Sequence, residues 1–369
     1  MQVPADSLFL FFSGALFLTV FLSPPTILVL KRLGIVRHDE RDFSVLITER
    51  KTKAGTPIMG GIVIVGVITL LTLFFNWKRE ITYVPIGVLL LSAAFGGADD
   101  LMNIFYKHSR PVRTLGKIGR LIKTHKSVLM RAWYALTFPW HVYKRFFFLL
   151  GSHPGRGIQA HEKILVQLAI GIAVAWWLSF KLNWTELWVP WGDHIELGIF
   201  IIPLVIFLVM FMANAVNITD GIDGLSAGTL LIAFGTYFII ALQQGSASMA
   251  FLIATTMGAL AGYLIFNIAP AKFQMGDVAS LGLGILLTAI AFALDRVFLL
   301  PIIGGVFFIE IGSVLVQTAW RVLFGRRLLL MAPLHHHLEA RSWGEARIVM
   351  YAWTLGALLS SLALWLSYH

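Results

Sequence analysis

Long apolar runs alternate with short polar stretches along the whole chain, and most of the runs are as long as membrane-spanning helices. An α-helix needs about 20 mostly apolar residues to cross about 30 Å of hydrocarbon. Ten runs are predicted to be spans: residues 8–30, 57–75, 81–98, 164–180, 197–212, 225–242, 249–266, 278–294, 297–320 and 348–367. The pattern therefore predicts an all-α, polytopic membrane protein of about ten helices, with residues 1–369 in a single domain.

The composition supports a membrane protein and excludes several other classes. Mean hydropathy is +0.80, with 58% hydrophobic and 13% charged residues, values that soluble globular domains do not reach. A net charge of +10 would suggest nucleic-acid binding in a soluble protein. In a membrane protein it is typical of cationic cytoplasmic loops, so we expect no nucleic-acid partner. The absence of cysteine excludes disulfides, thiol catalysis and cysteine metal sites.

The distribution of lysine and arginine predicts which side each loop faces. In a ten-span chain the loops that share one side are residues 31–56, 101–163, 213–224, 267–277 and 321–347. They hold 25 of the 29 Lys and Arg residues, and cationic loops stay in the cytoplasm. The bias predicts that these loops are cytoplasmic and that both termini lie on the opposite side.

Four polar clusters end apolar runs, and all four are predicted on the cytoplasmic side. They are Asp99–Asp100, Asp220 with Asp223, Asp277, and His335–His337. A carboxylate at the edge of a bilayer usually marks a substrate or ion site, because its desolvation must be offset. The four clusters therefore predict one shared site that faces the cytoplasm.

Carboxylates with nearby lysines and histidines suit a hard divalent cation and a phosphate. Mg²⁺ is commonly held by one or two carboxylates together with substrate phosphates. Asp277 is predicted at a helix start beside Gly276, where the backbone and the positive end of the helix dipole favour a phosphate. We expect Asp277 to hold the metal, and lysine and histidine side chains to neutralise charge on the leaving group.

The same residues have plainer interpretations. Asp99–Asp100 is also typical of a solvated helix end, and Asp220–Asp223 of a tight turn. The three histidines could form a zinc site, although adjacent side chains seldom converge on one ion. Glu310, inside the ninth run, is either functional or a polar contact between helices. A secondary transporter also has charged, broken helices, but its site should lie near the midplane, and no inverted repeat is visible.

Five motifs together resemble one known family. They are GTPIMGG at 55–61, DD at 99–100, NAVNITDGIDGL at 214–225, FNIAPAKFQMGD at 266–277 and APLHHHLE at 332–339. Their order and spacing are similar to those of the phospho-N-acetylmuramoyl-pentapeptide-transferases, within the polyprenyl-phosphate N-acetylhexosamine-1-phosphate transferase superfamily. The PLHHHLE segment favours this branch over the GlcNAc-1-phosphate transferases, which remain the alternative within the enzyme class.

The resemblance implies a reaction, a cofactor and a location. It implies transfer of phospho-MurNAc-pentapeptide from UDP-MurNAc-pentapeptide to undecaprenyl phosphate, giving lipid I and UMP with Mg²⁺. This is the first membrane step of peptidoglycan synthesis. The enzyme would lie in the bacterial inner membrane with its active site facing the cytoplasm, both termini in the periplasm and membrane lipids around it. A homodimer or docking of later peptidoglycan-pathway enzymes is also open.

The resemblance assigns roles by position. Asp277 matches the metal ligand, Asp99 the base that deprotonates the lipid phosphate, and Asp100 its assistant; His335 is the histidine most expected to act in catalysis. The expected substrate-binding residues are Lys53, Lys163, Asn214, Asn217, Asp220, Gly221, Asp223, Leu225, Asn267, Phe273, His336 and His337. Among them, Asp220, Gly221, Asp223 and Leu225 belong to the loop that would hold uridine, and Lys163 would lie near the diphosphate.

Three features depart from the family pattern. The family has Phe three residues before the metal aspartate, where this chain has Gln274 and its Phe at 273. It has Tyr and Lys after the aspartate pair, where this chain has Leu101 and Asn103. Residues 101–155 form a basic insertion longer than the family needs.

Part of this insertion has its own pattern. Residues 127–150 interleave aromatic residues with cations, as in a helix that lies in the membrane interface. It is not counted as a span, because it is interrupted by Arg131, His141, Lys144 and Arg145. Contact with anionic lipid headgroups, docking of a pathway enzyme and a merely solvated insertion are its three interpretations.

Overall fold

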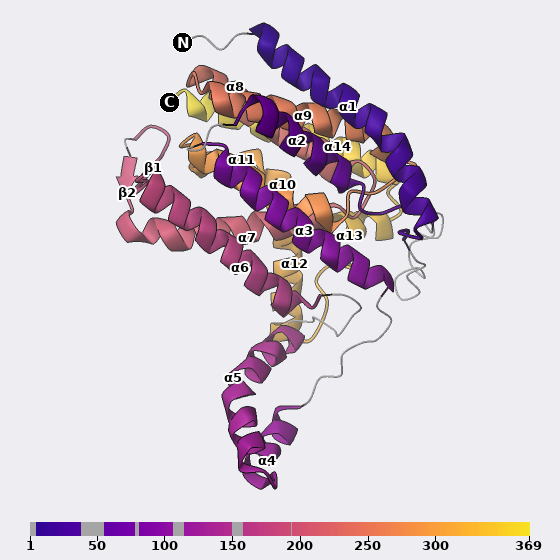
Figure 1. Ribbon diagram of the computed structural model, residues 1–369, viewed down its shortest axis with the longest axis vertical. Helices are drawn as coiled ribbons and strands as arrows, with labels where there is room; N and C mark the ends of the chain where they lie inside the picture. The colour runs from indigo at the N-terminus through magenta and orange to yellow at the C-terminus, as the bar shows by residue number, and fades with distance from the viewer. Residues whose placement is uncertain (1–4, 38–54, 78–80, 106–113, 150–157, 193) are drawn as a thin grey trace.

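The computed structural model describes residues 5–37, 55–77, 81–105, 114–149, 158–192 and 194–369. The described residues form α-helices and one small β-hairpin (Figure 1). The first helices are α1 Ala5–Arg32, α2 Gly61–Phe75, α3 Tyr83–Phe105, α4 Leu115–Thr124, α5 Val128–Leu149, α6 Ala160–Trp176 and α7 Ile201–Thr219. The others are α8 Leu225–Gln243, α9 Ala247–Asn267, α10 Asp277–Ala293, α11 Leu300–Ile303, α12 Gly305–Phe324, α13 Leu334–Ala340 and α14 Glu345–Ser367. A π-helical turn, Trp177–Lys181, continues α6.

All ten predicted runs lie on helices, which confirms an all-α, polytopic membrane protein. Eight helices of the described chain are long and apolar enough to cross a membrane. The runs at 57–75 and 278–294 correspond to α2 and α10, which are shorter, with 15 and 17 residues. The run at 297–320 is divided, because a short turn at Val297–Leu299 and α11 precede α12.

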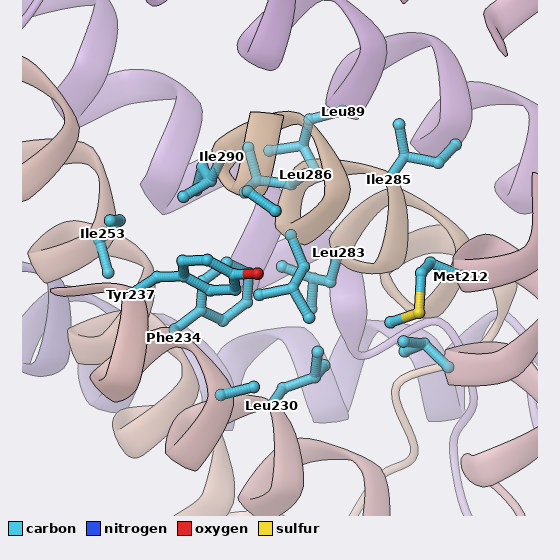
Figure 2. Close-up of a cluster of buried hydrophobic side chains, with 14 of the residues drawn as sticks. Leu89, Met212, Leu230, Phe234, Tyr237, Ile253, Leu283, Ile285, Leu286 and Ile290 are labelled. Atoms are coloured by element: carbon cyan, nitrogen blue, oxygen red, sulfur yellow. The ribbon is translucent and has the colours of Figure 1, made fainter. Parts of the chain in front are cut away.

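Helix α10 is the centre of the bundle. Fifteen of its seventeen residues are buried, so it is surrounded by protein on nearly every side. Figure 2 shows apolar side chains converging on it from α3, α7, α8 and α9: Leu89, Met212, Leu230, Phe234, Tyr237 and Ile253. Because α10 begins at Asp277, this packing fixes the position of the carboxylate at its first residue.

Helices α3 and α7 continue through the polar residues at which their predicted spans end. The predicted span 81–98 stops before the aspartate pair, but α3 continues to Phe105. The predicted span 197–212 likewise stops before Asn214, but α7 continues to Thr219. Asp99 and Asn217 therefore lie inside helices, and the polar partners described below explain why the helices continue through them.

The β-hairpin was not expected from the sequence. Strands β1, Glu186–Trp188, and β2, His194–Glu196, pair antiparallel at the end of the bundle opposite the C-terminal end of α3 (Figure 1). His194 Nε2 lies 2.6 Å from Asp295 Oδ2, and the Trp188 amide donates to Asp295 Oδ1 at 3.3 Å. Strands of three residues are too short to show a period of two in the sequence.

Candidate active site

An ion-paired cluster joins α3, α6 and α10 at one end of the bundle. Lys163 Nζ lies 2.6 Å from Asp99 Oδ2 and 2.7 Å from Asp277 Oδ2. Asp99 is fully buried, and the Lys163 side chain is partly exposed. The interpretation of Asp99 as a solvated helix end is therefore wrong, because its carboxylate is buried and paired with a cation.

Close contact between α3 and α10 brings the carboxylates together. Gly96 of α3 lies against the backbone of Asp277, where a Cβ would overlap the Asp277 carbonyl. Gly276, just before α10, has φ +71°, a conformation that L side chains rarely adopt, and lies against Asp100 Oδ2. Small residues at both contacts let the two backbones approach closely.

Neutral donors complete the shell around Asp99 and Asp277. Asn217 Nδ2 donates to Asp277 Oδ1 at 2.7 Å and to Ser280 Oγ at 2.9 Å. The Ile158 amide donates to Asp99 Oδ1 at 2.6 Å, and Asn103 Nδ2 donates to Asp99 Oδ2 at 3.2 Å. Asn103, at a position where the family has Lys, thus supports Asp99 without charge.

Asp100 differs from its neighbour. It is buried and accepts a hydrogen bond from the Val278 amide near the start of α10. Its Oδ2 is nevertheless buried without a hydrogen-bond partner among the described residues. A buried carboxylate oxygen left without a donor is costly, and such an atom is available for a proton or a cation.

The oxygen ligands fit Mg²⁺ better than zinc. Asp99, Asp100 and Asp277 supply only carboxylate oxygens, the ligands that a hard divalent cation prefers. Within the described chain no three His, Cys, Asp or Glu side chains form a ready-made metal site. An open set of one or two carboxylates, completed by substrate phosphates, is how Mg²⁺ is usually held.

The loop from Asp220 to Gly224 is held by side chains of α9 and α14 and by the backbone after α9. The Ala271 amide donates to Asp223 Oδ2 at 3.0 Å, and the Gly224 amide donates to Asn267 Oδ1 at 3.0 Å. Trp353 Nε1 of α14 donates to the Gly224 carbonyl at 3.3 Å. Leu225 is fully buried against the start of α14. Asp223, Asn267 and Leu225 therefore fix the shape of the loop.

Asp220 faces the aspartate cluster from this loop. It follows α7 directly, its side chain is half-buried, and the Gly276 amide hydrogen-bonds to its carboxylate. Burial raises the pKa of Asp220 from 3.8 to about 8, because the ionised form loses water, while that amide opposes the shift. Through this hydrogen bond, Asp220 connects the Asp220–Gly224 loop to the residue before Asp277.

The three histidines point to different partners, so a three-histidine zinc site is not formed. His335 Nδ1 lies 3.0 Å from Glu310 Oε2, and its ring packs on Gly221. His336 Nδ1 pairs with a carboxylate oxygen of Glu339, three residues along α13. His337 Nδ1 accepts from the Leu330 amide at 3.1 Å, and burial and then Arg341 lower the pKa of its imidazole. His335 is the histidine whose ring lies against the Asp220–Gly224 loop, at Gly221.

Glu310 was predicted to be either a functional residue or a polar contact between helices, and it was not included among the expected site residues. It is buried in α12, and the His335 backbone amide also donates to its Oε2, at 3.3 Å. His335 Nε2 is buried without a partner among the described residues. Glu310 therefore fixes the ring orientation that presents Nε2 at Gly221. The available signal was a single carboxylate inside an otherwise uncharged membrane run.

The remaining predicted residues have contacts outside the aspartate cluster. Asn214 exchanges hydrogen bonds with Gln167 of α6, at 2.6 and 3.3 Å, and so holds α7 to the helix that carries Lys163. Phe273 is fully buried against Tyr263 and Phe266, so packing accounts for it here. Gln274 accepts from Arg37 at 3.3 Å. Lys53 lies outside the described residues, and the substrate-binding roles of Asn214 and Phe273 stay predictions.

Comparison with known proteins identifies the family. Residues 146–295 match glycosyl transferase family 4. The chain is 35% identical over 351 residues to a phospho-N-acetylmuramoyl-pentapeptide-transferase of Halalkalibacterium halodurans, covering 95% of this chain and 94% of the relative. It is 33% identical over 372 residues to the protein of that name from Geobacillus kaustophilus, covering 99% of both. With similarity over nearly its whole length, the chain belongs to the phospho-N-acetylmuramoyl-pentapeptide-transferase family.

Proposed function

We propose that the protein transfers phospho-MurNAc-pentapeptide from UDP-MurNAc-pentapeptide to undecaprenyl phosphate, giving lipid I and UMP. The observation that carries the proposal is the cluster of Asp99, Lys163 and Asp277, held together by 2.6 and 2.7 Å ion pairs. Three carboxylates and one lysine at the end of a helical bundle suit a diphosphate with a divalent cation. The family supplies the substrates.

In the reaction, an oxygen of the lipid phosphate bonds to the β-phosphorus of the UDP-sugar. The bond from that phosphorus to the bridging oxygen breaks, and the electron pair leaves with UMP. Most of the acceleration comes from positioning and charge neutralisation. Direct attack inverts the configuration at phosphorus, whereas a route through an aspartyl-phosphate retains it, so chirally labelled substrate distinguishes the two.

The described residues divide these tasks. Asp277 would hold Mg²⁺, which when bound neutralises charge on the diphosphate, and Asn217 orients Asp277 through its 2.7 Å hydrogen bond. Lys163 contacts both carboxylates and is placed to turn to the diphosphate. Asp99 and Asp100 form the proton-accepting pair. Asp100 Oδ2 is the oxygen without a partner among the described residues, whereas both oxygens of Asp99 have donors.

The uridine end is assigned to the Asp220–Gly224 loop. His335 packs on Gly221, and Asp220 accepts from the Gly276 amide beside the metal aspartate. A nucleotide held by this loop would therefore reach Asp277 with its phosphates. His336 and His337 lie on α13 beside His335 and are only partly buried, which suits contact with the same substrate.

The proposal places this end of the bundle in the cytoplasm. Twenty-five of the 29 Lys and Arg residues lie in loops on that side, and UDP-linked substrates are cytoplasmic. Protease accessibility of a tag at each terminus in intact cells tests it, with both tags expected to be cleaved from outside.

Substrate choice tests the reaction. Purified protein with undecaprenyl phosphate and Mg²⁺ is expected to release UMP from UDP-MurNAc-pentapeptide and not from UDP-GlcNAc. Release from UDP-GlcNAc alone would assign the chain to the GlcNAc-1-phosphate branch. Flux of the nucleotide across sealed vesicles without UMP release would instead indicate a transporter.

A further inference from the structure

Residues 114–149 of the basic insertion form a helical arm outside the bundle. Helices α4 and α5 pack on each other and project from the rest of the molecule, with α5 crosswise to α6 (Figure 1). Between Thr114 and Leu149 the arm has seven Lys and Arg residues and no acidic residue. We propose that this arm binds the surface of the membrane that the bundle spans, by inserting one face of α5 among anionic lipid headgroups.

The two ends of the same face of α5 have different surroundings. Residues at positions 129, 133, 136, 140, 143 and 147 recur at three- and four-residue intervals and so lie along one side of the helix. At the C-terminal end, Trp140, Tyr143 and Phe147 pack around His161 at the start of α6. The Tyr143 hydroxyl also donates to the His161 carbonyl at 3.0 Å. This end of the face is part of the bundle.

The N-terminal end of the face is uncovered. Leu129, Trp133 and Leu136 are 83%, 58% and 76% exposed. Helix α4 packs on a different part of α5. His125, just after α4, contacts Tyr134 of α5, and Ile118 of α4 is fully buried. Large apolar side chains in a continuous stripe on a projecting helix mark an interaction surface.

The charges of the arm identify the occupant of this surface. Lys117, Arg120 and Lys123 are exposed along α4, and Lys126 is exposed in the turn before α5. Clusters of four or more cations beside an amphipathic helix attract anionic headgroups across about 8–10 Å of salt solution. An apolar stripe with unopposed cations is typical of a helix that lies in the interface.

The position of α5 next to a membrane-spanning helix also puts the arm close to the membrane surface. Helix α5 meets α6 at His161, the second residue of a helix that is long and apolar enough to span the bilayer. The root of the arm therefore lies where a span enters the membrane. Since α5 extends crosswise from that point, its uncovered stripe runs along the membrane surface and not away from it.

The experiment exploits the absence of cysteine. Leu136→Cys, labelled with an environment-sensitive fluorophore, reports the stripe in the full-length protein, and Lys123→Cys reports the cationic helix α4. Both are reconstituted in nanodiscs of phosphatidylcholine with phosphatidylglycerol, and quenched with spin-labelled lipid. We expect strong quenching at position 136 and weaker quenching at position 123, because a cation of α4 would stay at the level of the headgroups while the stripe inserts below them.

Removing charge tests the anionic component. A triple variant of the protein labelled at position 136 carries Lys117→Gln, Arg120→Gln and Lys123→Gln. We expect these changes to lower the ratio of lipid-quenched to water-exposed label at least fivefold. Nanodiscs of pure phosphatidylcholine are expected to lower the ratio for the unsubstituted arm by the same factor. A label at 136 that stays water-exposed in both nanodiscs would overturn the proposal. So would protection that requires added cytosolic protein, since that outcome assigns the stripe to a protein partner. Circular dichroism of each variant confirms that the helices are retained.

Discussion

At the residue scale, the proposed reaction centre depends on one lysine that joins two carboxylates. Lys163 lies 2.6 and 2.7 Å from oxygens of Asp99 and Asp277. An ion pair that loses one partner in a buried setting leaves an uncompensated charge, which is more costly than the pair was favourable. Lys163 therefore stabilises the carboxylate cluster, and in the proposed reaction the same side chain would contact the diphosphate.

Lys163→Gln is expected to lower kcat by on the order of 10²–10³, because a charge that stabilises the transition state is lost. The variant should also have a lower Tm in EDTA than the original protein. Mg²⁺ should restore part of the lost Tm, because the cation replaces the missing positive charge between the carboxylates. UMP release and thermal unfolding in detergent measure the two effects. Lys181→Gln, at the other end of the same helix, is the control, and equal effects of the two changes would contradict this role.

Glu310 is expected to act through His335. Glu310→Gln keeps a hydrogen-bond acceptor at the 3.0 Å contact, whereas Glu310→Ala leaves the His335 ring without it. We expect a roughly tenfold loss of kcat/KM for Glu310→Ala and a smaller loss for Glu310→Gln. Glu196→Gln, on the exposed β-hairpin, should leave kcat/KM unchanged. Equal losses in the two Glu310 variants would contradict a role through the hydrogen bond to His335.

Asp220 predicts a dependence of stability on pH. Its pKa is about 8 in the folded protein and 3.8 when the chain is unfolded, so the folded protein holds a proton that the unfolded chain has lost between these values. The contribution of Asp220 to stability therefore falls as pH rises from about 4 to about 8. In the protein without nucleotide, the Tm advantage of Asp220→Asn over the original should grow across this window. A constant difference would contradict the assigned burial.

At the element scale, the sequence predicted the helices well and their ends poorly. Ten apolar runs predicted ten helices, since hydrophobic length is decided locally. The ends of α3 and α7 were placed too early, because Asp99 and the asparagines at 214 and 217 read as polar stops. Their partners, Lys163 and Asp277, are distant in the sequence, and a local pattern cannot show such pairing.

The site was predictable in membership and less so in contacts. The polar clusters predicted Asp99 and Asp277 in one site, the family resemblance added Lys163 near the diphosphate, and the structure joins the three side chains. The His335–Glu310 pair could not be read from spacing, because the two residues lie on different helices and one of several possible partners had to be chosen. The different directions of the three histidines follow from the helical geometry of α13, which the sequence pattern did not predict.

The root of the arm gives a prediction for two elements together. Tyr143 and Trp140 of α5 pack on His161, two residues before Lys163. Tyr143→Ala is expected to lower kcat roughly threefold to tenfold without changing substrate specificity, because the start of α6 is less firmly positioned. Tyr351→Ala, on the exposed side of α14, is the control. Unchanged kcat would show that the arm and the site are independent.

At the scale of the whole molecule, a buried central helix ends at the proposed reaction centre. Helix α10 is enclosed by α2, α3, α7 and α8, so Asp277 at its first residue is held by the core of the bundle and not by a loop. The Asp220–Gly224 loop reaches the residue before Asp277 through the hydrogen bond from the Gly276 amide to Asp220, and α13 contacts that loop through His335 and Gly221. The fold therefore holds the Asp277 carboxylate firmly at one end of the bundle, while the β-hairpin lies at the other end.

The most direct test of this account is UMP release by Asp277→Asn. The purified variant, in detergent with Mg²⁺, undecaprenyl phosphate and UDP-MurNAc-pentapeptide, is compared with Asp6→Asn, an exposed aspartate at the start of α1. We predict that Asp277→Asn inserts, folds and elutes like the original protein but releases no UMP above background, while Asp6→Asn retains full activity. Normal Mg²⁺-dependent release of UMP by Asp277→Asn would contradict the assignment of the metal and the reaction to this cluster.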